Sequence, residues 1–249
     1  MGSVKENILV SIITVCYNSE KTIERTVKSM LSQSYSNYEY LIVDGKSTDK
    51  TLDIVRQYEP LFQGRMRVIS EADQGIYDAM NKGISLASGE LIGMINSDDY
   101  YEADALEIMV GEYLKKREPH MILYGFQRNF QGEREKSTVL FHHDFLVEQM
   151  ITHPTCFVTK KVYEDFGKFD LSYRSSADYE FMLRLYQKQK VVFHPVYKVI
   201  ANFQMGGMSS SQVGYRETLG LQYQYGGMTK GRYLKLKLKS HLYELLHGR

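Results

Sequence analysis

The chain of 249 residues has no tryptophan and only two cysteines, Cys16 and Cys156. Two cysteines form no disulfide framework, so we expect a reducing compartment, the cytoplasm. No run of about 18 apolar residues is present, which predicts no membrane-spanning segment, and the first residues lack the apolar centre of a signal peptide. The motifs G-x-x-x-x-G-K-S/T and G-x-G-x-x-G are also missing, which argues against a P-loop nucleotidase and a nicotinamide-dependent dehydrogenase.

The chain also has almost no net charge, because 31 basic residues face 30 acidic ones, for a formal charge of +1. This balance excludes a chain-wide basic footprint, so no nucleic-acid partner is expected. The average nevertheless conceals two unlike segments. Residues 44–104 carry twelve acids against six bases, and residues 229–249 carry six bases against one acid. An acidic middle and a basic tail predict two different electrostatic roles.

Apolar, β-branched runs alternate with segments whose apolar residues recur at helical spacing, which predicts an α/β fold wound from strand–helix–strand units. The expected strands are 9–15, 39–43, 66–70 and 90–95, and the expected helices are 23–31, 52–58, 76–84 and 105–113. The second half is less regular. Its expected elements are a strand at 121–126, a polar loop at 127–150, a helix at 179–189, one or two strands at 191–200 and a flexible loop at 205–211 that could close over a ligand.

Polar clusters follow three of the predicted strands: Tyr17-Asn18, residues 44–49 and residues 96–99. Ligands of open α/β sheets bind at these carboxyl ends. Asp98 and Asp99 are adjacent carboxylates that repel each other unless a cation lies beside them. Hard oxygen ligands of this kind suit Mg²⁺ or Mn²⁺ when a substrate diphosphate completes the shell. Taken alone, the pair could equally be an exposed acidic turn.

Together these residues resemble the family 2 glycosyltransferases, inverting enzymes of the GT-A fold, and in particular bacterial members that build surface polysaccharides. The resemblance covers roughly residues 8–210. It is carried by Thr14-Val-Cys-Tyr-Asn18, Val43-Asp-Gly-Lys-Ser-Thr-Asp49, Asp73-Gln-Gly-Ile-Tyr-Asp-Ala-Met-Asn-Lys-Gly83, Asn96-Ser-Asp-Asp99 and Ser176-Ala-Asp-Tyr-Glu180. It implies a Rossmann-like mixed sheet flanked by helices, with a C-terminal helical extension.

The resemblance also implies site residues. Those of the nucleotide-sugar site would be Thr14, Tyr17, Asn18, Asp44, Gly75, Asn81 and Asp98, with Tyr17 beside the uracil and Asp44 bonded to the base. Asp98 and Asp99 would hold Mn²⁺ or Mg²⁺, and Asp178 would be the general base. The family often has an acid where Asn96 and Ala177 stand here, which leaves roles at these two positions open.

The implied activity is metal-dependent, inverting transfer of a sugar from a nucleotide sugar, with UDP favoured by the resemblance, to a lipid-linked or oligosaccharide acceptor in cell-surface polysaccharide synthesis. The alternatives are a sugar-phosphate nucleotidyltransferase and a non-catalytic nucleotide-sugar-binding protein of the same fold. Asp178 could instead cap the helix that follows it, and Glu180 is the alternative base. His142, His143 and His153 lack a fourth ligand at recognised zinc spacing.

We expect a glycosyltransferase domain at 1–228, with a nucleotide-sugar half at about 8–115 and an acceptor half at about 116–228. The segment 229–249 is expected to form a basic amphipathic helix, since one helical face gathers Leu234, Leu238, Leu242, Leu245 and Leu246. Such a helix can contact the anionic inner face of a membrane, pack on its own domain or join a twin subunit as a homodimer.

Overall fold

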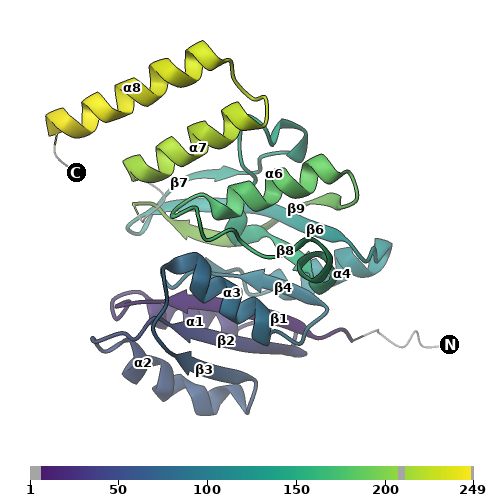
Figure 1. Cartoon of the computed structure of the whole chain (residues 1–249). Helices are drawn as coiled ribbons and strands as arrows, with labels where there is room; N and C mark the ends of the chain where they lie inside the picture. The colour runs from purple at the N-terminus through teal and green to yellow at the C-terminus, as the bar shows by residue number, and fades with distance from the viewer. Residues whose placement is uncertain (1–6, 207–210, 248–249) are drawn as a thin grey trace.

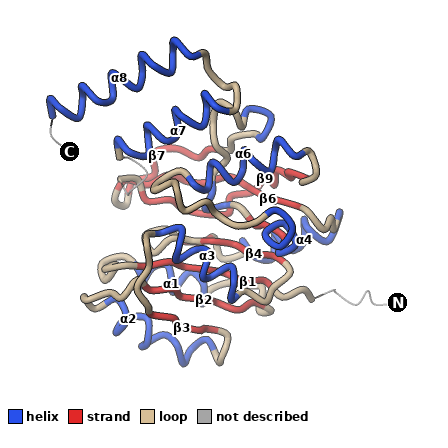
Figure 2. The backbone as a smooth tube through the Cα atoms, in the orientation of Figure 1, coloured by secondary structure: helices blue, strands red, loops and turns tan. Residues whose placement is uncertain are grey.

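The computed structural model describes residues 7–206 and 211–247, and in these residues helices cover both faces of a nine-stranded mixed sheet. The strand order is β3-β2-β1-β4-β8-β6-β9-β5, and β7 pairs with β6 (Figures 1 and 2). The strands are β1 Val10–Cys16, β2 Tyr38–Asp44, β3 Met66–Ser70, β4 Leu91–Met94, β5 Tyr100–Tyr101, β6 Met121–Gln131, β7 Arg134–Val139, β8 Phe157–Thr159 and β9 Val192–Gln204. The α-helices are α1 Ile23–Leu31, α2 Thr51–Tyr58, α3 Ile76–Leu86, α4 Ala105–Lys116, α5 Lys160–Phe166, α6 Ala177–Lys188, α7 Gln212–Gln224 and α8 Lys230–His247.

Strands β1 to β4 are parallel, as the buried apolar runs predict, and their order reverses at β1. The chain moves outward from β1 through β2 to β3 and returns through α3 to β4 on the other side of β1. Strand β8 then pairs antiparallel with β4, so one continuous sheet joins both halves of the chain. A crevice is expected where the strand order reverses, at the carboxyl ends of β1 and β4.

Each face of the sheet has its own apolar core, because successive strand residues point to opposite faces. Ile13 of β1 packs with α3, α5 and α6, whereas Ile12 packs with α1, α2 and α4. This two-sided burial accounts for the near-continuous apolar runs in the sequence. The expectation of an α/β fold with a Rossmann-like mixed sheet and C-terminal helices is confirmed.

The prediction of a polar loop at residues 127–150 is partly wrong. Strand β6 continues to Gln131, and β7 returns beside it as an antiparallel hairpin. Residues of β7 are almost all exposed, so no buried apolar alternation marked this strand in the sequence. The sequence pattern also did not predict helices α5 and α7.

The C-terminal end consists of α7 and α8, which lie against each other at the edge of the molecule distant from β1–β3 (Figure 1). The flexible loop expected at 205–211 falls largely on residues 207–210, which lie outside the described residues. Among the described helices, none combines the length and the apolar character that crossing a bilayer requires.

Candidate active site

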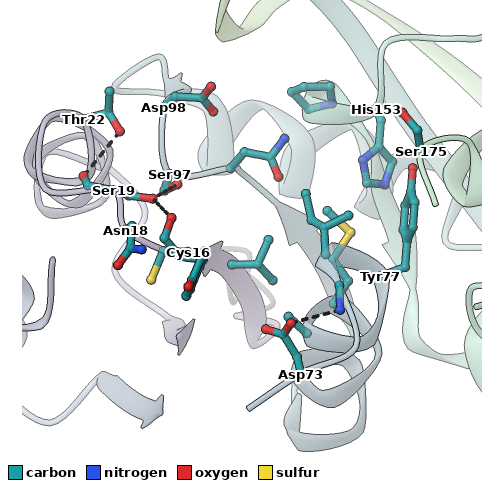
Figure 3. A pocket seen from close by; sticks show the side chains of 18 of the residues that line it. Cys16, Asn18, Ser19, Thr22, Asp73, Tyr77, Ser97, Asp98, His153 and Ser175 are labelled. Atoms are coloured by element: carbon teal, nitrogen blue, oxygen red, sulfur yellow. Dashed lines mark hydrogen bonds between the residues drawn. The ribbon is translucent and has the colours of Figure 1, made fainter. Parts of the chain in front are cut away.

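A cavity of about 730 Å³ opens at the reversal point of the sheet. The segment after β1, the segment after β4 and the start of α3 contribute most of its wall. Figure 3 shows Asn18, Ser19 and Asp98 on one side, with Tyr77, His153 and Ser175 on the other. A hydrogen bond of 2.8 Å between the hydroxyls of Ser19 and Ser97 joins the segments after β1 and β4. Of the predicted residues, the cavity is lined by Tyr17, Asn18, Gly75, Asp98 and Asp178.

Tyr17 is 63% exposed, which leaves its aromatic face available to a planar ligand. The next residue, Asn18, has a left-handed backbone with φ 49°, a conformation that asparagine tolerates well. Its side-chain oxygen accepts a hydrogen bond of 2.9 Å from the backbone of Thr48, and its backbone donates one of 2.8 Å to Ser47. Asn18 therefore turns the chain after β1 and fixes it to the segment after β2.

Asp44 and Thr14 are fully buried beneath the cavity and do not line it. The Asp44 carboxylate accepts hydrogen bonds from the backbone of Ser47 at 3.0 Å and from the hydroxyl of Ser70 at 2.7 Å. Thr14 accepts one of 3.0 Å from the hydroxyl of Tyr40. In this structure both residues stabilise the carboxyl ends of the strands, and the contact of Asp44 with a base stays a prediction.

Cys16 lies next to Asp44, with its sulfur 3.7 Å from the carboxylate. Burial and the neighbouring carboxylate raise the pKa of the Cys16 thiol. A thiol that stays protonated is a poor nucleophile, as the position of Cys16 in an apolar strand indicates.

Gly75 and Asn81 come from one motif but have different surroundings. Gly75 lines the cavity just before α3 with φ 120°, a backbone conformation that favours glycine. Asn81 is absent from the cavity wall, and its side chain makes two hydrogen bonds to the backbone of Phe169, at 2.9 and 3.0 Å. The structure thus uses Asn81 to hold the segment before α6 against α3.

The two acids after β4 differ in exposure. Asp98 lines the cavity, and burial raises the pKa of its carboxyl. Asp99 is fully buried, and its Oδ1 accepts a hydrogen bond of 2.9 Å from the backbone of Gln204. Burial, followed by the charge of Asp98, raises the pKa of Asp99 well above its usual value. Among the described residues no basic side chain bonds either carboxylate, since Arg25 donates to the backbone oxygen of Asp98. The charge of Arg25 offsets only part of the burial and repulsion, and two adjacent carboxylates of this kind fit a divalent cation.

Asp178 lies in the first turn of α6, and Tyr77 of α3 donates a hydrogen bond of 2.8 Å to its Oδ1. None of the described residues bonds Oδ2, so this oxygen is left for a ligand. His153 lies close enough to be influenced by the Asp178 charge, but burial dominates and lowers the pKa of His153. Two donors therefore hold the carboxylate at Oδ1: the hydroxyl of Tyr77 and the backbone N–H of Tyr179, the latter at 2.9 Å.

Two alternatives remain for this segment, a capping role for Asp178 and a base role for Glu180. Asp178 does accept a hydrogen bond of 2.9 Å from the backbone of Tyr179 at the start of α6. Ser176, and not Asp178, occupies the N-cap position of α6. Glu180 lies outside the cavity wall and pairs with Arg184, whose Nε lies 2.8 Å from its Oε1. Glu180 is thus a structural partner of Arg184 in this fold.

His142, His143 and Asp144 come together, with candidate ligand atoms within 4.8 Å of one another, whereas His153 lies in the cavity. Other contacts account for the cluster without an ion: His142 lies 3.1 Å from Asp144, and Nδ1 of His143 lies 2.6 Å from the hydroxyl of Tyr124.

A second cavity of about 500 Å³ adjoins the first. Its wall consists of residues 148–150, the start of α6 and one side of α7. Ser175 and Asp178 line both cavities. Asp178 therefore lies at the junction of two spaces that can hold two different molecules.

Sequence reasoning assigned no role to Tyr77, although this residue contacts the predicted base. Tyr77 lies within the motif at residues 73–83, but a tyrosine in the first turn of a helix is commonly a buried core residue, so its type and position alone indicate no role in the site. Only the packing of α3 against α6, which lie 101 residues apart at this contact, reveals the hydrogen bond.

Comparison with known proteins agrees with this architecture. The model of glycosyl transferase family 2 matches residues 11–191. A PGL/p-HBAD biosynthesis glycosyltransferase of Mycobacterium bovis is 31% identical over 211 residues, which cover 82% of this chain and 80% of the relative. Chondroitin synthase of Escherichia coli is 31% identical over 191 residues, 74% of this chain but only 27% of that protein.

Solved structures share the fold. S. aureus TarS 1–349 in complex with UDP-GlcNAc aligns with a TM-score of 0.73 at 19% identity, covering 97% of this chain and 76% of TarS. The mannosyltransferase PcManGT from Pyrobaculum calidifontis, in complex with GDP-Man and Mn²⁺, aligns with a TM-score of 0.67 at 16% identity. The alignment covers 96% of this chain and 70% of PcManGT. The chain belongs to glycosyl transferase family 2 and is a glycosyltransferase of the GT-A fold.

Proposed function

We propose that this glycosyltransferase moves a sugar, with inversion, from a UDP-sugar in the first cavity to a hydroxyl of an acceptor in the second. The observation that carries the proposal is the position of Asp178, which lines both cavities. A general base must reach the acceptor hydroxyl while the donor sugar lies on the other side of that hydroxyl. A carboxylate at the junction meets this requirement.

In the first cavity, the exposed ring of Tyr17 would stack on the base, and Asn18 and Gly75 would border the nucleotide. Asp98 and Asp99 would hold Mn²⁺ or Mg²⁺, which when bound offsets the negative charge of the diphosphate leaving group. The Mn²⁺ bound with GDP-Man in the related fold of PcManGT supports this assignment. UDP is proposed by analogy with the UDP-GlcNAc complex of TarS.

In the second cavity, Oδ2 of Asp178 would accept the proton of the acceptor hydroxyl. The hydroxyl oxygen then forms a bond to the anomeric carbon from the face opposite the diphosphate. The bond between that carbon and the diphosphate oxygen breaks, and its electron pair leaves with UDP. One in-line displacement inverts the anomeric configuration. The acceptor in this proposal is a saccharide, lipid-linked or free, in surface polysaccharide synthesis.

Thermal unfolding with a panel of nucleotides tests the proposal. A UDP-sugar at about 100 times its Kd adds about 2.7 kcal/mol to the stability of the native state, which raises Tm by roughly 5–10 °C in a chain of this length. We expect this rise with Mn²⁺ and a much smaller one with EDTA. A rise with UTP and a sugar phosphate, together with pyrophosphate release, would instead favour the nucleotidyltransferase alternative.

A further inference from the structure

Helix α8 packs against α7 with its polar side, which is the reverse of the usual arrangement for an amphipathic helix on a globular domain. Arg216 of α7 lies 2.8 Å from Glu244, and the hydroxyl of Ser240 donates a hydrogen bond of 2.7 Å to Gln212. The rings of Tyr223 and Tyr233 stack with centroids 4.9 Å apart. The contact between the two helices therefore uses Tyr233, Ser240 and Glu244, which lie on a single side of α8 at spacings of two turns and one turn.

The apolar side of α8 points away from the rest of the protein. Four leucines at spacings of four and three residues share one helical face. This leucine face consists of Leu234, Leu238, Leu242 and Leu245, which are 53%, 61%, 50% and 81% exposed. Figure 1 shows that α8 lies beyond α7, at the periphery of the molecule. An exposed apolar face of this kind marks an interaction surface.

Basic residues flank the leucine face on both sides. At 3.6 residues per turn, Lys235 and Lys239 lie along one border and Lys230 along the other. These three lysines form no ion pair with a described residue, whereas Lys237 donates a hydrogen bond of 3.2 Å to the hydroxyl of Tyr233 on the side toward α7. The one acid of the helix, Glu244, is held by Arg216 on the opposite side. The surface that α8 presents is thus apolar in the middle and positive at its borders.

We infer that α8 lies on the surface of an anionic lipid bilayer, with the leucine face in the acyl boundary and the flanking lysines among the headgroups. This is the composition that a helix in the membrane interface requires. A second copy of the chain fits less well, because two leucine faces in contact would bring lysines opposite lysines.

The same geometry indicates the acceptor class, an inference that rests on the proposed function. Another side of α7 lines the second cavity through Gly214, Tyr215, Thr218 and Gln222, and Gln212 at the start of the helix touches both α8 and this cavity. One helix therefore separates α8 from the cavity that would hold the acceptor. A bilayer on α8 would place that cavity close to the membrane surface, where the sugar of a lipid-linked acceptor is located.

Co-sedimentation with vesicles tests the inference on the full chain. We expect binding to vesicles of phosphatidylcholine with phosphatidylglycerol, weaker binding to phosphatidylcholine alone, and release by salt. K235Q/K239Q should weaken partitioning about thirtyfold, at roughly 1 kcal/mol for each charge. L238S/L242S should reduce it on the order of a hundredfold or more. L61S/L171S, which alters two exposed leucines outside α8, is the matched control and should bind like wild type.

Two results would overturn the inference. The first is equal vesicle binding by wild type and both α8 variants, with circular dichroism showing that all are folded. The second is a stable dimer in lipid-free solution that L238S/L242S converts to monomer, which would assign the leucine face to a second copy. Vesicle binding is measured without substrate, so a failure of the proposed reaction leaves this result standing.

Discussion

The hydroxyl of Tyr77 donates a hydrogen bond of 2.8 Å to Oδ1 of Asp178, and so couples the start of α3 to the start of α6. Burial and the adjacent carboxylate raise the pKa of Tyr77, so the phenol remains a donor throughout the physiological range. With Oδ1 engaged, Oδ2 is the oxygen that is left for the acceptor. Tyr77 is thus a positioning residue for the proposed base.

Tyr77→Phe removes this hydrogen bond while keeping the ring. A hydrogen bond to a charged group contributes about 1.5–3 kcal/mol, so we expect kcat to fall roughly 10- to 100-fold with little change in KM for the donor. Steady-state kinetics with both substrates varied provides the measurement. Tyr179→Phe is the matched control, since its buried hydroxyl donates to the backbone of Leu146 and not to a reacting group. Equal losses of kcat in both variants would reduce Tyr77 to a packing role.

Asn81→Ala distinguishes a role in the nucleotide-sugar site, which the family resemblance implies, from the structural role that its hydrogen bonds indicate. Because the side chain makes two hydrogen bonds to the backbone of Phe169, the variant should lose about 1–3 kcal/mol of stability. The KM for the donor should stay near the wild-type value. Chemical denaturation and donor kinetics measure the two effects. A large rise in KM without loss of stability would instead place Asn81 in the nucleotide site.

Asp99→Asn should raise the stability of the metal-free protein and abolish metal-dependent activity. The amide oxygen can still accept from Gln204, but the variant removes a buried charge that faces Asp98. Thermal unfolding with EDTA measures the gain, and Mn²⁺ titration of Tm measures the lost response. An unchanged response to Mn²⁺ would exclude Asp99 as a ligand.

The buried imidazole of His153 predicts a pH effect on stability. Burial lowers the pKa of His153 below its usual value of 6.5, so the unfolded chain binds a proton first as the pH falls. Stability from this group is therefore present above about pH 6.5 and is lost below it, by at most about 1.4 kcal/mol per pH unit for one proton. His153→Gln should flatten the decline between pH 6.5 and 5.

Urea unfolding at several pH values checks this effect, with His241→Gln on the exposed side of α8 as control. A slope in His153→Gln equal to that of wild type would contradict the assignment.

The parallel half of the fold was predictable because its strands are buried on both faces and read as apolar runs. Strand β7 was not, since its residues face solvent and carry no apolar alternation. The same contrast holds in the site. Tyr17, Asn18 and Asp98 follow strand ends and reach the cavity as expected, because strand ends converge at one edge of a sheet.

The surroundings of the other predicted site residues depend on contacts between segments that are distant in the sequence. Asp44 ends β2 as predicted, but Ser47 and Ser70 surround its carboxylate. The side chain of Asn81 donates a hydrogen bond to the backbone of Phe169, and the carboxylate of Glu180 accepts one from Arg184. Local sequence shows that a polar side chain is present, but not which partner folding brings to it.

UDP release in the presence of Mn²⁺, compared between Asp178→Asn and Glu180→Gln, tests whether Asp178 is the general base. Wild type should release UDP from its preferred UDP-sugar only when a saccharide acceptor is supplied. Asp178→Asn should lose roughly 100- to 10,000-fold of kcat, the usual contribution of a general base, while keeping the Tm shift caused by UDP. Glu180→Gln should lose stability and retain kcat per folded molecule. Full activity in Asp178→Asn, or its loss in folded Glu180→Gln, would contradict the assignment of Asp178 as the base.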